Sequence, residues 1–266
     1  SNYEIASYTQ TNVGGMANLL DVIVNKKLPI KKIIMTASMT SYGEGKSRCP
    51  SCGIVKPDLR PASQLAKNDW AVRCPLCNKS TEPVATDETT PLSNNSIYSL
   101  TKYMQEQELL LMGGMYSIPV VSLRCFNVYG PRQSLSNPYT GVSAIFISRL
   151  KNNHSPFIYE DGLQTRDLVS VHDVVDALVL SMTKDGANHQ VINIGSGMPT
   201  PIVEVATTLA GLLAKDINPA ITGEYRLNDI RHCFADIKKA KQILGWKPKV
   251  ILEQGWKELI SWSDDE

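Results

Sequence analysis

The sequence predicts an α/β protein built on a doubly wound parallel sheet, and two observations indicate this fold class. An apolar strand over residues 31–38, a helix that begins near Tyr98 and a second apolar strand over residues 120–126 follow one another, which is the βαβ order of a parallel sheet. Both strands run into polar residues, Ser38 and Asn127. Parallel sheets bind ligands at the carboxyl ends of their strands, so these residues are expected at a site.

The remaining elements follow from apolar periodicity and from turn residues. Apolar side chains recur on one side of residues 3–26 and predict a helix. The segment 45–86 is richer in proline, cysteine and charge than its flanks, which indicates an insertion. We further expect helices over 142–151 and 173–183, strands over 156–159, 168–171 and 191–194, and a C-terminal helix that Gly245 and Pro248 terminate.

Composition narrows the class of protein. The chain has 266 residues, enough for one large or two small domains, and a net charge of +1. This neutral balance argues against nucleic acid as a partner. No apolar run is long enough to span a membrane, and no signal peptide is recognisable. We therefore expect a cytoplasmic globular enzyme or binding protein.

Four of the six cysteines form two C-x-x-C knuckles, Cys49/Cys52 and Cys74/Cys77. Two such turns present four thiolates to one tetrahedral ion, which is the pattern of a structural zinc site with no open position for catalysis. Disulfides, free thiols and a redox pair are the alternatives, and disulfides are uncommon in cytosolic chains. The sequence predicts a zinc-ribbon-like lobe over residues 45–86.

Tyr98 and Lys102 stand four residues apart, on one face of the predicted helix. An ammonium beside a phenol favours the phenolate and lowers the tyrosine pKa, so Tyr98 is a candidate base for a sugar hydroxyl. Pairs with this spacing are also common on ordinary exposed helices, so the pattern alone does not establish catalysis.

Seven motifs in order give the chain a resemblance to a known family. They are Asn12-Val13-Gly14-Gly15, Ser38 with Tyr42-Gly43, Tyr98 with Lys102, Phe126–Arg132, Asp161–Asp167, Asn193–Gly197 and Asp229–Asp236. Together they resemble the extended short-chain dehydrogenase/reductases, specifically the NAD-dependent nucleotide-sugar epimerases and dehydratases. The cysteine insertion resembles the dTDP-L-rhamnose 4-epimerase-like branch, and the UDP-glucose 4-epimerase-like branch is the other candidate.

The resemblance implies a Rossmann-type NAD-binding domain over residues 1–132, to which 168–197 return. It also implies a smaller nucleotide-sugar-binding domain over 133–167 and 198–266. Family members begin with a glycine-rich G-x-x-G-x-x-G turn that holds the dinucleotide pyrophosphate, and this sequence has no such motif. We therefore expect a Rossmann-type sheet that is N-terminally incomplete, and weak or no NAD binding by the chain alone.

The resemblance also implies roles for single residues. Ser38, Tyr98 and Lys102 form the implied catalytic set, with Tyr98 as general acid/base and Lys102 on the nicotinamide ribose of NAD. Asn12, on the first helix, is implied to face the cofactor together with these three residues.

Substrate-binding roles are implied for Thr40, Asn127, Arg166, Arg226 and Arg231. Thr40 is a second hydroxyl beside the catalytic serine, and Asn127 matches a position that contacts the substrate diphosphate. The arginines resemble a diphosphate clamp, which suits a planar bidentate donor. Arg226 precedes Leu-Asn-Asp where the family usually has x-Gly-Asp, and Arg231 competes with it for the role.

These roles imply NAD-dependent C4 epimerisation of a nucleotide-diphosphate sugar through a transient 4-keto sugar. A homodimer is also implied, in which Met104, Leu111, Met112 and Met115 supply apolar surface. The alternatives are a nucleotide-sugar 4,6-dehydratase or decarboxylase, and a non-catalytic NAD-sensing or partner-docking protein.

The residues after Ser38 bear on the choice between epimerase and dehydratase. Related dehydratases follow the catalytic hydroxyl with Asp-Glu, whereas Met39 and Thr40 stand here. A methionine has no proton to donate, and an unactivated threonine hydroxyl is a poor base. The sequence therefore favours epimerisation, although a carboxylate from elsewhere, Glu44 or Glu88, remains a candidate for elimination chemistry.

Overall fold

The computed structural model describes residues 4–134 and 141–264. Residues 1–3, 135–140 and 265–266 lie outside the described part. Tyr3 of the predicted first helix is therefore not covered, nor are these parts of the predicted domain ranges.

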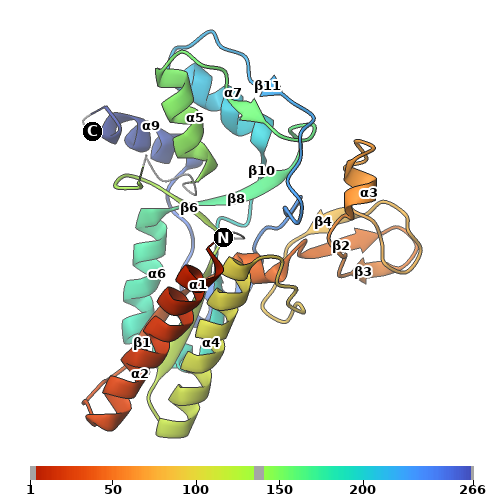
Figure 1. The fold of residues 1–266 in the computed structure, drawn as a ribbon. Helices are drawn as coiled ribbons and strands as arrows, with labels where there is room; N and C mark the ends of the chain where they lie inside the picture. The colour runs from red at the N-terminus through yellow and green to blue at the C-terminus, as the bar shows by residue number, and fades with distance from the viewer. Residues whose placement is uncertain (1–3, 135–140, 265–266) are drawn as a thin grey trace.

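A three-stranded parallel sheet organises one half of the fold (Figure 1). Its strand order is β1 (Ile33–Ser38), β5 (Val120–Cys125) and β9 (Gln190–Ile194). Residues pair from Ile33 opposite Val120 to Ser38 opposite Cys125, so β1 and β5 end side by side. The predicted α/β fold with a Rossmann-like parallel sheet is confirmed.

Helices cover both faces of this sheet. Val120 packs in a cluster with Met112 of α4 (Ile97–Tyr116), whereas Val121 packs in a separate cluster with residues of α6 (Val171–Thr183). Successive side chains of a strand point to opposite faces, so α4 and α6 lie on opposite sides of β5. This double cover explains why β5 is buried along its whole length. Its two polar residues, Ser122 and Arg124, are bound by the buried carboxylate of Glu106 on α4.

The predicted helix over 3–26 consists of three consecutive segments, α1 (Ile5–Tyr8), η1 (Thr9–Gly14) and α2 (Gly15–Asn25). The middle segment is a π-helix, and the backbone keeps right-handed helical angles at both junctions. The three segments lie beside α4 at the front of Figure 1.

A second group of elements lies beyond the carboxyl ends of the parallel strands. Its sheet has the order β10 (Pro199–Pro201), β8 (Thr165–Ser170) and β6 (Asn127–Tyr129). Three helices share an apolar core beside this sheet, α5 (Val142–Lys151), α7 (Ile202–Leu212) and α9 (Leu252–Trp262). The shorter elements are β7 (Phe157–Ile158), which pairs with β11 (Ala220–Ile221), η2 (Met39–Tyr42), η3 (Asp185–Ala187) and α8 (Lys238–Leu244).

Residues 168–197 were expected to return to the cofactor-binding domain, but strand β8, which contains the first of them, belongs to the second sheet. Whereas α6 packs on the parallel sheet and β9 pairs within it, β8 pairs with β6 and β10. Because β6 begins two residues after β5 ends, the chain turns directly from the parallel sheet into the second sheet.

The inserted segment is a separate antiparallel sheet that projects from the side of the molecule in Figure 1. Its strands have the order β3 (Gly53–Val55), β2 (Lys46–Cys49) and β4 (Glu82–Val84), and α3 (Ala62–Leu65) follows β3 in the chain.

The two ends of the insertion meet at its base. The backbone N–H of Lys46 donates to the Thr86 hydroxyl at 3.1 Å. Gly45 has φ +66°, and a Cβ there would lie 2.5 Å from Thr86 Oγ1, so only glycine fits.

None of the helices within 4–134 and 141–264 combines the length and the apolarity that crossing a membrane requires.

Candidate active site

A cavity of about 1080 Å³ opens between the carboxyl edge of the parallel sheet and the second group of elements. Its walls come from the end of β1, the start of α4, strand β6, helix α5 and the segment around β7. Seven of the predicted site residues line it: Ser38, Thr40, Tyr98, Lys102, Asn127, Arg166 and Arg226.

Ser38 is the last residue of β1 and the N-cap of the short helix η2. Its Oγ accepts a hydrogen bond from the backbone N–H of Thr40 at 3.3 Å. The two hydroxyl oxygens, Ser38 Oγ and Thr40 Oγ1, lie 2.9 Å apart. The strand end and the cap thus fix two hydroxyls side by side at the cavity.

Tyr98 enters the cavity from the first turn of α4 because the helix begins just before it. Ser96 is the N-cap, and it forms a capping box with Ser99. Lys102 follows one turn later on the same wall of the cavity. The N-cap at Ser96 therefore determines where both side chains lie, because it fixes the first turns of α4.

The prediction that Lys102 lowers the pKa of Tyr98 is wrong for the chain as described. Burial raises the Tyr98 pKa, and the opposing effect comes from a hydrogen bond with Ser38. Lys102 Nζ instead donates to Gln105 Oε1 at 2.8 Å, on its own helix. Burial also lowers the Lys102 pKa. The phenol is therefore the resting form of Tyr98 at neutral pH.

The opposite end of the cavity is cationic and aromatic. Arg226 stacks over the ring of Tyr159, with 4.8 Å from Cζ to the ring centroid. Arg166 donates to Asp229 Oδ1 at 3.3 Å. The Oδ1 atom of Asn127 is buried at the cavity without a hydrogen-bond partner. The two guanidinium groups offer donors to an anionic ligand, whereas Asn127 Oδ1 offers an acceptor.

Two predicted site residues lie elsewhere than the cavity wall. Asn12 donates from Nδ2 to Thr101 Oγ1 at 3.0 Å, which ties η1 to α4. Arg231 is buried, and its guanidinium is bound by the carboxylates of Glu160 and Asp161. The Arg231 contacts differ from the expected role at the diphosphate, since its guanidinium already has protein partners. The cofactor role of Asn12 stays a prediction.

Carboxylates are scarce in this cavity. Asp229 is the single acidic residue among its described lining residues, and it is held by Arg166. Glu44 is buried outside the cavity and accepts from the backbone N–H groups of Arg231 and His232. Glu88 accepts from the backbone N–H of Asn193 at 2.8 Å.

Sequence reasoning missed several cavity residues, among them Arg149, Phe157 and Tyr159. Arg149 lies over the Phe157 ring at 3.8 Å from its centroid, which parallels the Arg226 pair. The alternation Phe157-Ile158-Tyr159 was the available signal, since it puts two aromatic rings on one side of a strand and Ile158 in the core.

The four knuckle cysteines come together at the insertion. One sulfur from each of Cys49, Cys52, Cys74 and Cys77 lies within 4.8 Å of the others. The Sγ atoms of Cys49 and Cys77 are 3.5 Å apart. All six cysteines of the chain are free of disulfides.

Comparisons with known proteins relate this chain to one family. Residues 76–195 match the family model described as the NAD dependent epimerase/dehydratase family. A dTDP-L-rhamnose 4-epimerase of Burkholderia thailandensis is 35% identical over 263 residues, which cover 99% of this chain and 71% of that protein. The chain belongs to the NAD-dependent epimerase/dehydratase family. The resemblance predicted from the motifs is thereby confirmed.

Other family members are similar over shorter stretches or in structure. A putative UDP-glucose 4-epimerase of Methanocaldococcus jannaschii is 36% identical, over 66% of this chain and 56% of that protein. The structure of a UDP-glucose 4-epimerase from Thermotoga maritima with UDP-glucose has a TM-score of 0.80 and 30% identity, and it matches 100% of this chain and 73% of its own.

Proposed function

We propose that the protein catalyses NAD-dependent C4 epimerisation of a nucleotide-diphosphate sugar through a transient 4-keto sugar. The observation that carries the proposal is one cavity with two chemically different ends. Ser38, Tyr98 and Lys102 line one end, and Arg226 with Tyr159 lines the other. The first end suits proton transfer at a sugar hydroxyl, and the second suits an anionic, partly aromatic ligand.

The residues present fit NAD as the cofactor. Asn127 Oδ1 is a buried acceptor without a partner at the cavity. The Lys102 ammonium has three N–H donors, of which the Gln105 side chain accepts one. Lys102 and Tyr98 would hold the ribose and nicotinamide side of the cofactor. When bound, NAD supplies a reversible hydride acceptor for C4. The nearby hydroxyl of Ser38 orients the sugar O4 toward the Tyr98 oxygen.

Tyr98 acts as the base and then as the acid. Its raised pKa keeps the proton on the phenol in the free protein, so the phenolate has to be favoured by positive charge when substrate and cofactor bind. Lys102 is one turn away on the same helix and is the one lysine among the described lining residues of the cavity. Taking the O4 proton and returning it on the same atom leaves the enzyme unchanged after each turnover.

Arg166 and Arg226 are proposed as the diphosphate ligands. Each lines the cavity. Arg166 donates to Asp229 and to the carbonyl oxygens of Thr165 and Arg231, which uses three of its five N–H groups, and Arg226 stacks on Tyr159. Arg231 is not proposed for this role, because Glu160 and Asp161 already occupy its guanidinium.

Elimination of water is the less suitable reaction for this cavity. It needs a carboxylate near the catalytic hydroxyl, yet Met39 and Thr40 follow Ser38 and the described lining offers only Asp229. Asp229 stands beside Arg166, at the binding end.

The test is an NMR assay of the full-length protein with NAD and a panel of UDP- and dTDP-sugars. Interconversion of C4 epimers, with neither free NADH nor loss of water, is the expected result. The matched Tyr98→Phe variant should lose most of its activity. Accumulation of a 4-keto-6-deoxy product from a nucleotide hexose would replace the epimerase proposal with a dehydratase.

The insertion is proposed to hold one structural zinc ion. A tetrahedral ion with Zn–S bonds of about 2.3 Å sets its ligand sulfurs about 3.8 Å apart. The four sulfurs of the cluster, all within 4.8 Å of one another, fit that spacing. Cys49, Cys52, Cys74 and Cys77 would supply all four ligands, so the ion has no open position for catalysis.

A homodimer through α2 and α4 is also proposed. Leu19 and Val22 of α2 and Met104, Leu111 and Met115 of α4 are exposed apolar residues on two adjacent helices. Met112, which was expected to contribute, is 6% exposed and packs in the core beneath α4.

A further inference from the structure

Arg60 belongs to the insertion, and its side chain is buried against the second group of elements. Its partner Glu160 lies 100 residues later in the chain. Its guanidinium forms two hydrogen bonds to Glu160, from Nη1 to Oε2 at 2.8 Å and from Nη2 to Oε1 at 2.9 Å. Nη2 also donates to the carbonyl oxygen of Asp229 at 3.2 Å. The Arg60 side chain is 2% exposed, so water does not screen these contacts.

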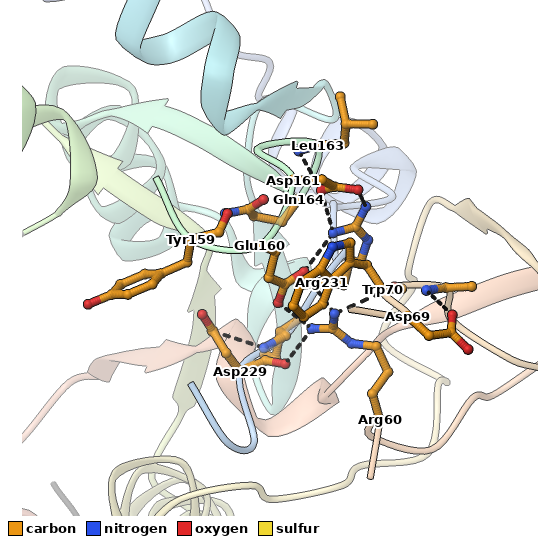
Figure 2. Close-up of polar contacts among 12 residues, drawn as sticks. Arg60, Asp69, Trp70, Tyr159, Glu160, Asp161, Leu163, Gln164, Asp229 and Arg231 are labelled. Carbon is orange, nitrogen blue, oxygen red and sulfur yellow. Dashed lines mark hydrogen bonds and ion pairs between the residues drawn. The ribbon is translucent and has the colours of Figure 1, made fainter. Parts of the chain in front are cut away.

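Arg60 also forms an ion pair with Glu44, at 3.5 Å from Nε to Oε1, but its partners Glu160 and Asp229 adjoin the binding end of the cavity. Glu160 directly follows Tyr159, and the guanidinium of Arg226 stacks on the Tyr159 ring. Asp229 holds Arg166 through its carboxylate while its carbonyl accepts from Arg60. Figure 2 shows Arg60 reaching Glu160 and Asp229 from below, with the Tyr159 ring directed away from this network.

A second contact joins the same two parts. The Trp70 ring, also from the insertion, lies 6.2 Å from the ring of Tyr225, the neighbour of Arg226. The backbone N–H of Glu160 donates to the carbonyl of Glu224 at 2.7 Å, so the Tyr159 and Arg226 segments are bound to each other. The insertion thus contacts both segments that carry the cavity's aromatic and cationic groups.

The backbone of Glu160 has an unusual conformation, which makes its contacts with Arg60 important. It has φ +55°, in the left-handed region that a glutamate rarely adopts. Burial raises the Glu160 pKa, but hydrogen bonds and charge from Arg60 and Arg231 outweigh this and hold it below its usual range. The bidentate pair therefore fixes both the charge and the direction of a strained corner next to Tyr159.

We propose that Arg60 is a positioning residue for the nucleotide-diphosphate end of the cavity. It holds Glu160 and Asp229, and through them the ring of Tyr159 and the guanidinium groups of Arg226 and Arg166. The inference rests on the proposed function for the identity of the ligand. It assigns the insertion a part in substrate binding, while the proton transfer at Tyr98 is left to other residues.

The test compares Arg60→Met with Arg73→Met in the full-length protein. Arg73 is an arginine of the same insertion whose partner is Asp69, and its side chain is 37% exposed, so its loss should leave binding and turnover unchanged. Arg60→Met leaves Glu160 with Arg231 as a cationic partner, and Glu44 keeps its backbone donors at Arg231 and His232, which favours a folded variant. Calorimetry with UDP and dTDP measures the binding end directly.

For Arg60→Met we expect about tenfold weaker nucleoside-diphosphate binding and a similar rise in KM, with kcat within about twofold; tenfold corresponds to about 1.4 kcal/mol. Arg60→Lys retains the charge but not the two-pronged geometry, so an intermediate loss is expected. Equal binding by Arg60→Met, Arg60→Lys and the wild type would overturn the inference, and so would a fall in kcat with KM unchanged.

Hydrogen exchange of the free protein separates this inference from the proposed function. Arg60→Met, or Arg60→Lys if the first variant does not fold, should exchange faster over 157–161 and 224–231 than Arg73→Met. Unchanged protection there would overturn the inference even for an active enzyme. A wild type that binds neither UDP nor dTDP would instead refute the proposed function, while the exchange result still decides whether Arg60 orders this region.

Discussion

Ser38 and Cys125 stand opposite each other as the last paired residues of β1 and β5. One strand ends in the hydroxyl beside Thr40, and the other continues into Asn127 on the cavity wall. Because hydrogen bonds hold both strands up to this pair, the polar residues that follow are fixed by a rigid sheet edge. The groups proposed for catalysis therefore rest on the stable part of the fold.

Tyr98→Phe removes the proposed acid/base together with its hydrogen bond to Ser38. The ring makes an edge contact with Tyr8, at 6.0 Å between centroids, which phenylalanine retains. We expect kcat to fall by about 10² to 10⁴, the range of general acid–base catalysis. The melting temperature should fall by no more than about 4 °C, because one hydrogen bond is lost. Tyr103→Phe, a variant on the same helix outside the cavity lining, is the control for the NMR assay. Retained activity in Tyr98→Phe would exclude it as the base.

The cysteine cluster predicts a measurable metal content. Protein purified without chelator should contain about one zinc per chain by elemental analysis, and Cys74→Ser should lose most of it because one thiolate ligand is missing. Cys233→Ala is the matched control, since Cys233 is buried next to Thr86 and outside the cluster. A wild type with less than half a zinc per chain would contradict the proposal.

The exposed apolar face of α4 predicts association. Leu111 and Met115 are 67% and 68% exposed, and a dimer would cover them. Leu111→Glu should convert the full-length protein to a monomer in sedimentation at micromolar concentration, because a buried unpaired carboxylate is costly. Leu76→Glu, on the insertion and 75% exposed, should leave assembly unchanged. A wild type that sediments as a monomer would remove the basis of this proposal.

His232 predicts a stability that depends on pH. Burial, with Arg231, Arg166 and Arg60 nearby, lowers its pKa from 6.5 to about 4. Above pH 6.5 the imidazole is neutral in both the folded and the unfolded chain, so its contribution is fully present. Between pH 6.5 and 4 only the unfolded chain takes up the proton, and stability falls as pH falls.

The loss from His232 is at most about 3 kcal/mol. His232→Gln should remove it, so the free energy of unfolding of that variant should change less between pH 6.5 and 4.5 than that of the wild type. Denaturant titrations at the two pH values measure the difference. Parallel pH profiles for the two proteins would show that His232 protonates equally in both states.

Local patterns predicted most of the fold. Helix α5 matches its predicted range, and α4 begins where Ser96 caps it, because caps and apolar periodicity act within a few residues. The knuckle cysteines were identified for the same reason, since short turns determine the pairing within each knuckle.

Long-range partners were outside the reach of such patterns. The sequence predicted Arg231 as a phosphate ligand, but its guanidinium binds the carboxylate of Glu160, 71 residues away. The sequence predicted that the Lys102 ammonium acts on the Tyr98 phenol, but the ammonium binds the side chain of Gln105. The pair between Arg60 and Glu160 spans 100 residues and has no local signature at all.

The chain enters and leaves the insertion at one place, although side chains of the insertion also contact Glu160 and Tyr225. Its chain leaves at Gly45 and returns at Thr86, where the Lys46 backbone N–H meets the threonine hydroxyl. A segment whose ends already touch can be exchanged for a short loop at little cost in chain entropy. The lobe can therefore be removed or transferred as a unit. Its removal should leave the parallel sheet intact. A protein that receives the lobe needs a surface with counterparts of Glu160 and Tyr225.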